Sequence, residues 1–341
     1  GVPQDLGANA HAGGGEEFVI EADEYDRMFL GLRPDIAVIT NVEHDHPDCF
    51  PTPQEFHQAF ADFAALLRPG GALLVCGDDP GALQLAQNER LSSRRKYIYG
   101  MGSSSAKTGL DYQAKEVSLE KSGTYSYAAF HHGSFLSHVS LAVPGEHNVR
   151  NSLAALSVAH LLNLSLPEAS SALGRFRGTG RRFEIRGEVG GIVVIDDYAH
   201  HPTEIRATLA AAQSRYGDRQ LWVVWQPHTY SRTRLLLDQF AGAFQNADHV
   251  VVTEVYPARE SIDPGFSARQ VVDAMTHPDV HFIPDLDEVT TFLLARLQPG
   301  AVLLVLSAGD ADQVSTQILA ALAAHILLFH GDPNGREENY A

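Results

Sequence analysis

The sequence predicts an α/β protein of two domains. The chain has 341 residues, of which 44% are hydrophobic, so each of two domains can bury a core. Short β-branched runs alternate with segments of helical periodicity, a pattern typical of βαβ units and a mostly parallel sheet. The flexible stretch Gly178-Thr179-Gly180 precedes a new strand. We therefore place the domain boundary there, with one domain at residues 1–178 and the other at 179–341.

The first domain begins with the elements of a parallel sheet. Apolar runs predict strands at residues 18–21, 36–40 and 72–75, and helical periodicity predicts a helix at residues 55–67. From about residue 103 to 143 the segments alternate in polarity and are punctuated by Gly and Ser, which favours a small antiparallel sheet. Two further helices are predicted at residues 147–162 and 167–176.

The second domain repeats the alternation of strands and helices. Its strands are predicted at residues 183–189, 192–195, 221–225, 250–253 and 302–306. Helices are predicted to begin at Pro202 and to cover residues 232–244 and 311–323. The polar tail at residues 330–341 is predicted to be loosely held.

Composition excludes several classes of protein. The net charge of −17 argues against sequence-independent binding to nucleic acids or anionic membranes. The two cysteines, Cys49 and Cys76, form no CxxC pair, which fits a reducing cytoplasm. The longest apolar runs, such as residues 301–306, are too short to span a bilayer. The chain starts at Gly1 rather than Met, which indicates a fragment.

The most informative segment is Asp196-Asp197-Tyr198-Ala199-His200-His201-Pro202-Thr203-Glu204. It lies between a predicted strand and a predicted helix. Ligands of open α/β sheets bind at the carboxyl ends of strands. Two carboxylates, a phenol and two imidazoles at such a place indicate a functional loop, because an ordinary turn would be built from Gly, Asn or Pro.

A second polar segment, Gln226-Pro227-His228-Thr229-Tyr230-Ser231-Arg232, also follows a strand and opens a helix. Ser231 is the predicted N-cap of that helix. His228 and Arg232 would then lie at its positive end, where they could hold a carboxylate. A single His is more often a structural imidazole, but two polar clusters at one sheet edge favour a site.

Two acidic segments follow neighbouring strands in the first domain, at residues 21–26 and 40–48. Carboxylates at one sheet edge can hold Mg²⁺, which prefers oxygen ligands. His46 is a less usual ligand of Mg²⁺ and suits Mn²⁺ or an indirect role. A solvated acidic loop explains one such segment equally well, whereas two at matching positions favour a cation site.

Two shorter motifs lie beside the boundary. Asn148 and Asn151 share a face at a helix start, where they could bind a nucleobase edge, although simple capping explains Asn148 as well. Arg181 and Arg182 could bind phosphate, although pairs of surface arginines are common. The 17 His also leave a metal-dependent hydrolase open, but no His-Glu-x-x-His motif is present.

Taken together, these segments resemble the Mur ligases, ATP-dependent enzymes that assemble the peptide stem of peptidoglycan. The resemblance extends from about Glu17 to about Leu319, with the motifs in matching order and spacing. It is strongest to the members that join L-alanine to UDP-N-acetylmuramate. It implies a central ATP-binding-type domain without its N-terminal part, followed by a Rossmann-like C-terminal α/β domain. A member that recycles murein tripeptide is the alternative within the family.

The resemblance also implies a role for each cofactor-side residue. Glu21 and His46 resemble the ligands of the metal that bridges ATP and the acyl acceptor, with Mg²⁺ expected and Mn²⁺ possible as the ion. Asn148 and Asn151 resemble the amides that bind the nucleotide. His147 is a further candidate on the adenine side.

Five residues of the second domain receive roles in the same way. Arg182 and Asp197 resemble contacts to phosphate and ribose. His200, His228 and Arg232 resemble the residues around the incoming alanine and the muramoyl carboxylate. The implied reaction passes through an acyl phosphate, which the alanine amine then attacks.

The sequence departs from the family at one essential motif. No Gly-Thr-x-Gly-Lys-Ser/Thr phosphate loop occurs in the 341 residues, and Gly13-Gly14-Gly15-Glu16 is a poor substitute because no Lys follows it. We therefore expect little or no turnover from this chain alone and an exposed edge where a strand is missing. The alternatives from other classes are a non-catalytic module that binds nucleotide or a partner, and the metal-dependent hydrolase. The oligomeric state is not predicted.

Overall fold

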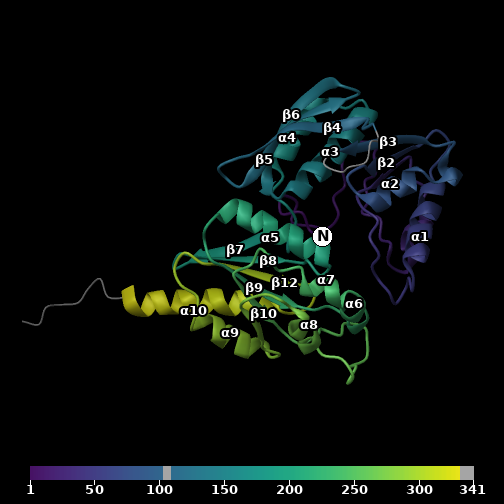
Figure 1. The fold of residues 1–341 in the computed structure, drawn as a ribbon. Helices are drawn as coiled ribbons and strands as arrows, with labels where there is room; N and C mark the ends of the chain where they lie inside the picture. Colours follow the sequence, from purple (N-terminus) through teal and green to yellow (C-terminus); the bar gives the residue numbers. More distant parts are fainter. Residues whose placement is uncertain (103–108, 331–341) are drawn as a thin grey trace, which may run out of the picture. The chain divides into compact units, whose positions relative to one another are not determined.

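The computed structural model of the protein describes residues 1–102 and 109–330. They form two compact units (Figure 1). Unit 1 contains Gly1–Thr179 together with Ala210–Arg215, and unit 2 contains Gly180–Leu209 and the chain from Tyr216 onward. The predicted polar tail lies outside the described residues from 331 on. Within the described residues, no helix combines the length and hydropathy needed to cross a bilayer.

Unit 1 is built on one mixed sheet in the order β1-β2-β3-β4-β5-β6. Strands β1 (Ile36–Ile39), β2 (Ala72–Cys76) and β3 (Arg95–Gly100) are parallel. Strands β4 (Tyr112–Leu119), β5 (Thr124–His131) and β6 (Ser134–Pro144) form the expected antiparallel part. A short parallel pairing of β3 with β4 joins the two parts, so the antiparallel strands continue the first sheet and do not form a second one.

The helices of unit 1 begin at residues suited to helix starts. Helix α1 (Pro53–Ala65) has Thr52 as N-cap, and α2 (Pro80–Ala86) has Asp79, each followed by a proline at the first helical position. Further helices of this unit are the short η2 (Glu89–Leu91), α3 (Glu146–Leu161) and α4 (Leu166–Arg175). α3 packs on strands β2 to β6, and the core of this unit also includes buried residues of α1, α2 and β1.

The strand predicted at residues 18–21 is wrong. The segment has no regular structure, and Phe18 and Val19 are 85% and 91% exposed. A 3₁₀ segment, η1 (Tyr25–Gly31), follows it. Strand propensity in an apolar run reflects packing on neighbours, and a run without a neighbouring strand gains nothing from it. β1 is the outermost strand of the described sheet, on the side where an exposed edge was expected.

Unit 2 is a second α/β layer structure with sheet order β11-β10-β9-β12-β8-β7. The parallel strands are β8 (Ile192–Asp197), β9 (Leu221–Gln226), β10 (His249–Val252), β11 (Val280–Phe282) and β12 (Val302–Ser307). β7 (Glu184–Val189) runs antiparallel to β8. The two are joined at Gly190-Gly191, both with positive φ, as a tight two-residue hairpin requires.

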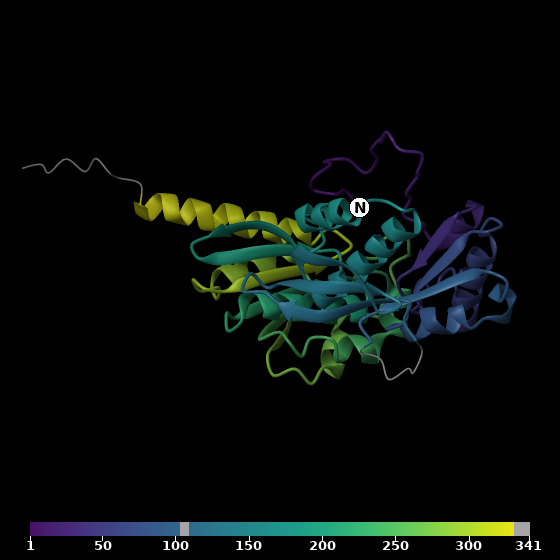
Figure 2. The ribbon, with the colours of Figure 1, turned by 90° about the horizontal axis from the view of Figure 1, so that it is seen from above.

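Helices cover both faces of this sheet (Figure 1). α9 (Leu286–Leu294) and α10 (Asp312–His330) share a core with Trp222, Val224 and alternate residues of the other strands. Figure 2 shows α10 as one continuous yellow helix. The opposite face carries α5 (Pro202–Tyr216), and Trp225 packs there on Phe240. α8 (Arg269–Ala274) lies beside the edge strand β11.

The helix predicted at residues 232–244 is instead two short helices. α6 (Tyr230–Leu235) and α7 (Leu237–Ala241) meet at Leu236, whose φ of −104° and ψ of 19° interrupt the helical backbone. Leu236, Phe240 and Phe244 are nevertheless buried, as the periodicity predicted. α6 thus carries Arg232 of the candidate site, and α7 carries the buried Phe240.

Candidate active site

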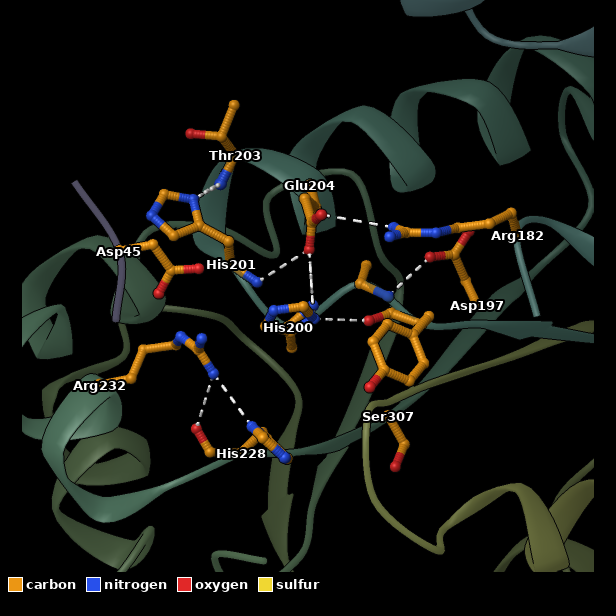
Figure 3. A network of polar contacts seen from close by, with 12 residues as sticks. Asp45, Arg182, Asp197, His200, His201, Thr203, Glu204, His228, Arg232 and Ser307 are labelled. Atoms are coloured by element: carbon orange, nitrogen blue, oxygen red, sulfur yellow. Dashed lines mark hydrogen bonds and ion pairs between the residues drawn. The ribbon is translucent and has the colours of Figure 1, made fainter. Parts of the chain in front are cut away.

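The loops after β8 and β9 lie at a crossover of the unit 2 sheet. The chain runs from β8 through α5 to β9, yet β12 lies between the two strands. The two loops therefore leave the sheet on either side of β12. Open α/β sheets bind ligands at such points. Both polar segments singled out in the sequence are found here (Figure 3).

Asp197 closes the turn that follows β8. Its carboxylate accepts hydrogen bonds from the backbone N–H of Phe183 at 2.8 Å and of Ala199 at 2.7 Å. Burial raises the pKa of Asp197 to about 6, although the nearby Arg182 and both amides act in the opposite direction. A buried carboxylate that titrates near neutral pH is common at functional sites.

Glu204, in the first turn of α5, accepts three hydrogen bonds from groups of this loop and from Arg182. One oxygen accepts from the backbone N–H of His200 at 3.0 Å and of His201 at 3.2 Å, and the other accepts from Arg182 at 3.3 Å. Burial alone would raise the pKa of Glu204, but His200, Arg182 and the two amides lower it below its usual value. Glu204 is thus an anion with fixed donors, and it fixes the backbone that carries His200.

His200, His228 and Arg232 come together from the two loops. The rings of His200 and His228 lie 5.8 Å apart. Arg232, which is 2% exposed, donates from Nη1 to Nδ1 of His228 at 3.0 Å (Figure 3). Because a guanidinium can only donate, His228 Nδ1 accepts and the proton of the neutral ring lies on Nε2.

The tautomer of His200 is the opposite one. Its Nδ1 donates to the backbone carbonyl of Tyr198 at 2.9 Å, since a carbonyl oxygen can only accept. In the neutral ring, Nε2 of His200 is then the nitrogen that can take up a proton. In their neutral forms the two imidazoles therefore differ in the nitrogen that carries the proton, which is Nε2 in His228 and Nδ1 in His200.

Arg182 is held but remains half exposed. It pairs with Glu204, and its guanidinium lies 5.5 Å from the centre of the Tyr198 ring. Its side chain is 49% exposed, so it can reach an anion while it stays beside Asp197 and Glu204. Its predicted contact with phosphate, and that of Asp197 with ribose, stay predictions.

The start of α6 differs from the prediction in one respect. The N-cap position is Thr229, and Ser231 lies inside the helix, where its hydroxyl donates to Glu260. The backbone N–H groups of Tyr230 and Ser231 donate to the same carboxylate, at 2.6 and 3.1 Å. The positive helix end is therefore occupied by Glu260, and the contact of His228 and Arg232 with a substrate carboxylate stays a prediction.

The nucleotide candidates lie in unit 1, at the start of α3. The N-cap of α3 is Gly145, with φ of 96°, so Asn148 does not cap the helix. Asn148 donates to the carbonyl of Pro144 at 2.7 Å, and Asn151 donates to Asn148 at 3.3 Å from an exposed position. His147 is partly buried, and its ring lies against Gly145. The role of these three residues in binding a nucleotide stays a prediction.

The predicted metal ligands also lie in unit 1. Glu21 has a side chain that is 86% exposed. His46 contacts Glu24 at 3.1 Å, and this hydrogen bond is the main cause that lowers the pKa of Glu24. Among the described residues, no three His, Cys, Asp or Glu side chains are arranged to hold a metal ion. The predicted ligands therefore do not fit a metal ion in this structure.

Sequence reasoning did not assign three residues that shape the site. Glu204 ends the segment that begins at Asp196, and its place at a helix start is a usable signal for a carboxylate that binds loop amides. Tyr198 contacts His200 edge-on at 5.4 Å. Glu260 lies 28 residues beyond Arg232 in the sequence, so no local pattern indicated it.

Comparisons with known proteins relate both units to one family. Residues 1–159 match the Mur ligase middle domain, and residues 181–309 match the Mur ligase glutamate ligase domain. A UDP-N-acetylmuramate–L-alanine ligase of Roseiflexus castenholzii is 42% identical over 94% of the chain, and one of Chloroflexus aggregans is 45% identical over 89%. A crystal structure of a UDP-N-acetylmuramate–alanine ligase from Thermotoga maritima covers 89% of the chain with a TM-score of 0.70 and 26% identity. The chain spans 69%, 66% and 63% of the lengths of these three proteins.

Proposed function

The chain belongs to the Mur ligase family, and we propose that it forms the central and C-terminal parts of an ATP-dependent ligase that joins L-alanine to UDP-N-acetylmuramate. This reaction belongs to peptidoglycan synthesis, in the cytoplasm. The observation that carries the proposal is the cluster of His200, His228 and Arg232 at the crossover of unit 2, in a chain whose relatives of that name are 42% and 45% identical.

The reaction proceeds in two balanced steps. A muramoyl carboxylate oxygen attacks the γ-phosphorus of ATP, so that an acyl phosphate forms and ADP leaves. The amine of L-alanine then attacks the acyl carbon, so that an amide forms, inorganic phosphate leaves and the amine gives up a proton. ATP is the phosphate donor, and the resemblance implies Mg²⁺, or Mn²⁺ in its place, as its ion; Glu21 and His46 are not assigned as its ligands, because the described His, Asp and Glu side chains form no metal-binding group.

The residues of unit 2 supply binding and proton transfer in the second step. Arg232 carries a fixed positive charge that binds the alanine carboxylate, as guanidinium groups commonly do. His228 donates from Nε2 to an oxygen of the substrate. His200 accepts the amine proton at Nε2, because its Nδ1 is already used by Tyr198. Arg182 and Asp197 serve the ATP side of the same reaction.

Calorimetric titration tests the nucleotide half of the proposal. A non-hydrolysable ATP analogue with Mg²⁺ should bind the wild-type chain, and an Asn151→Ala, Asp197→Ala double variant should lose that binding. Equal binding by both proteins would contradict the residue assignment. Repeating the titration with a phosphate-loop segment of a relative supplied would show how much affinity such a segment contributes.

Turnover assays test the amino-acid half. With the phosphate-loop region supplied, L-alanine should be ligated in preference to the murein tripeptide that the recycling members of the family use. Preference for the tripeptide would favour the alternative within the family. Phosphoester hydrolysis without ligation would overturn the proposal in favour of a hydrolase. The chain alone is expected to ligate far below the usual range of about 1–10³ s⁻¹.

A further inference from the structure

Helix α6 is held at its first turn by a carboxylate from another loop. Glu260 lies in the loop that follows β10, and one of its oxygens accepts from the backbone N–H of both Tyr230 and Ser231. The other oxygen accepts from the Ser231 hydroxyl. Three donors at the start of one helix thus converge on a single side chain, which is partly buried.

The helix needs such support because it is short and begins at a strained residue. α6 has six residues, too few for a helix to be stable by itself. Thr229, just before it, has φ of 66° and ψ of 142°, in the left-handed half of the map, which β-branched residues avoid. Such a backbone persists only where its surroundings fix it on several sides. Glu260 binds the two amides that come directly after Thr229.

The same loop also supports the residue before Thr229. The backbone carbonyl of Tyr256 accepts from the Thr229 backbone N–H at 2.9 Å, and the backbone N–H of Tyr256 donates to the Pro227 carbonyl at 2.8 Å. Its ring lies nearly parallel to the His228 ring, with 6.0 Å between centres. The loop from Tyr256 to Glu260 therefore holds the chain on both sides of the strained residue.

The supported segment carries His228 and Arg232, which form a hydrogen bond across the first turn of α6. A backbone that relaxed at Thr229 would rotate the amides of the first turn and change the separation of these two side chains. We propose that Glu260 is a positioning residue, which fixes the start of α6 so that His228 and Arg232 keep the geometry that binds the amino-acid substrate. The part about the substrate rests on the proposed function; the part about geometry does not.

The geometric part is tested without turnover. In ¹⁵N-labelled protein, the ring nitrogens of His228 should show the Nε2-protonated tautomer in the wild type, because Arg232 donates to Nδ1. Glu260→Ala and Glu260→Gln should both shift the signals toward a mixture of tautomers, and Glu260→Asp should restore part of the wild-type pattern. Unchanged His228 signals in folded Glu260→Ala and Glu260→Gln variants would overturn the inference.

A matched control separates positioning from helix capping in general. Asp285 also accepts from two backbone amides, those of Asp287 and Glu288, at the start of α9. Asp285→Asn should lower the melting temperature to a similar extent as Glu260→Gln while the His228 signals stay unchanged. If Asp285→Asn shifts the His228 signals as much as Glu260→Gln does, the effect is one of general destabilisation and the inference fails.

Kinetics then connect the geometry to the substrate. With the phosphate-loop region supplied, Glu260→Gln should raise KM for L-alanine about tenfold and leave kcat within about twofold, since misplaced binding groups weaken binding before they affect chemistry. A shifted tautomer with an unchanged KM would leave the positioning role intact and overturn the assignment of His228 and Arg232 to the amino acid. The two failures are thereby distinguishable.

Discussion

The candidate residues of the two units differ in how firmly the protein holds them. In unit 2, Asp197, Glu204 and Glu260 each accept from two backbone amides, and Arg232 is buried against His228. In unit 1, the side chains of Glu21 and Asn151 are exposed, and Asn151 bonds Asn148 at 3.3 Å. The side chains of the unit 2 loops are fixed by hydrogen bonds within the protein, whereas Asn151 of α3 lies exposed on the helix surface.

The fixed residues of unit 2 and the exposed residues of α3 should differ in their effect on the free energy of unfolding. Groups fixed for binding are often held in ways that do not favour folding, such as a buried charge or a strained backbone. Asp197 and Thr229 are examples in unit 2. We therefore expect substitutions in the unit 2 loops to change the free energy of unfolding strongly, and substitutions at the exposed α3 residues to change binding alone.

The largest effect is expected at Arg232. Arg232→Ala removes the donor to His228 and leaves a cavity where a buried side chain was. The free energy of unfolding should fall by about 3 to 4 kcal/mol, because hydrogen bonds of a charged group and buried packing are lost together. Denaturant unfolding followed by Trp fluorescence measures this change.

Arg234→Ala is the matched control for that substitution. Arg234 lies on the same short helix, is 56% exposed and pairs with Asp263 at the surface. Exposed ion pairs contribute little, so the loss should stay below about 1 kcal/mol. If Arg234→Ala lowers the free energy of unfolding as much as Arg232→Ala does, any substitution in α6 destabilises the protein. The contrast between the fixed residues of unit 2 and the exposed residues of unit 1 is then not supported.

A second expected effect comes from Asp197 and depends on pH. The pKa of its carboxyl is about 6 in the folded protein, above its usual value of 3.8. Below the lower value the group is protonated in both states; between the two values the folded state binds more protons, so its stability falls as pH rises. Above about pH 6 the penalty is complete and amounts to roughly 3 kcal/mol.

Asp197→Asn isolates this pH dependence, because the variant does not titrate. The difference in unfolding free energy, variant minus wild type, should increase by up to about 3 kcal/mol between pH 4 and pH 7. A constant offset from altered hydrogen bonds to Phe183 and Ala199 does not affect that slope. A difference that stays flat or decreases over this range would show that the carboxyl is not held at a raised pKa.

The contrast between the units also explains what the sequence could predict. The strands of unit 2 and the two polar loops after β8 and β9 followed from local patterns, because buried β-branched runs and motif composition are local properties. The backbone at Leu236 departs from the helix although the apolar periodicity continues through it, and the carboxylate of Glu260 reaches the start of α6 from a loop distant in sequence. The strand predicted at residues 18–21 failed for the same reason, since a strand exists only with its neighbour.

The smallest effect on stability is expected at Asn151. Its exposed side chain bonds Asn148 at 3.3 Å, so Asn151→Ala should change the free energy of unfolding by less than about 0.5 kcal/mol. Asn148→Ala should cost about 1 kcal/mol, because it removes a partly buried hydrogen bond to the Pro144 carbonyl.

Asn151→Ala should have a large effect on nucleotide affinity although its effect on stability is small. If α3 binds the nucleotide, Asn151→Ala should weaken the ATP analogue about tenfold or more in calorimetry although the fold is untouched, because an amide that pairs with a base edge is needed only when the ligand is present. Unchanged affinity in a fully folded Asn151→Ala variant would remove α3 from the nucleotide site. Lost affinity at wild-type stability would show that the exposed α3 residue matters only when a ligand is bound. The fixed loop residues of unit 2, by contrast, also change the free energy of unfolding.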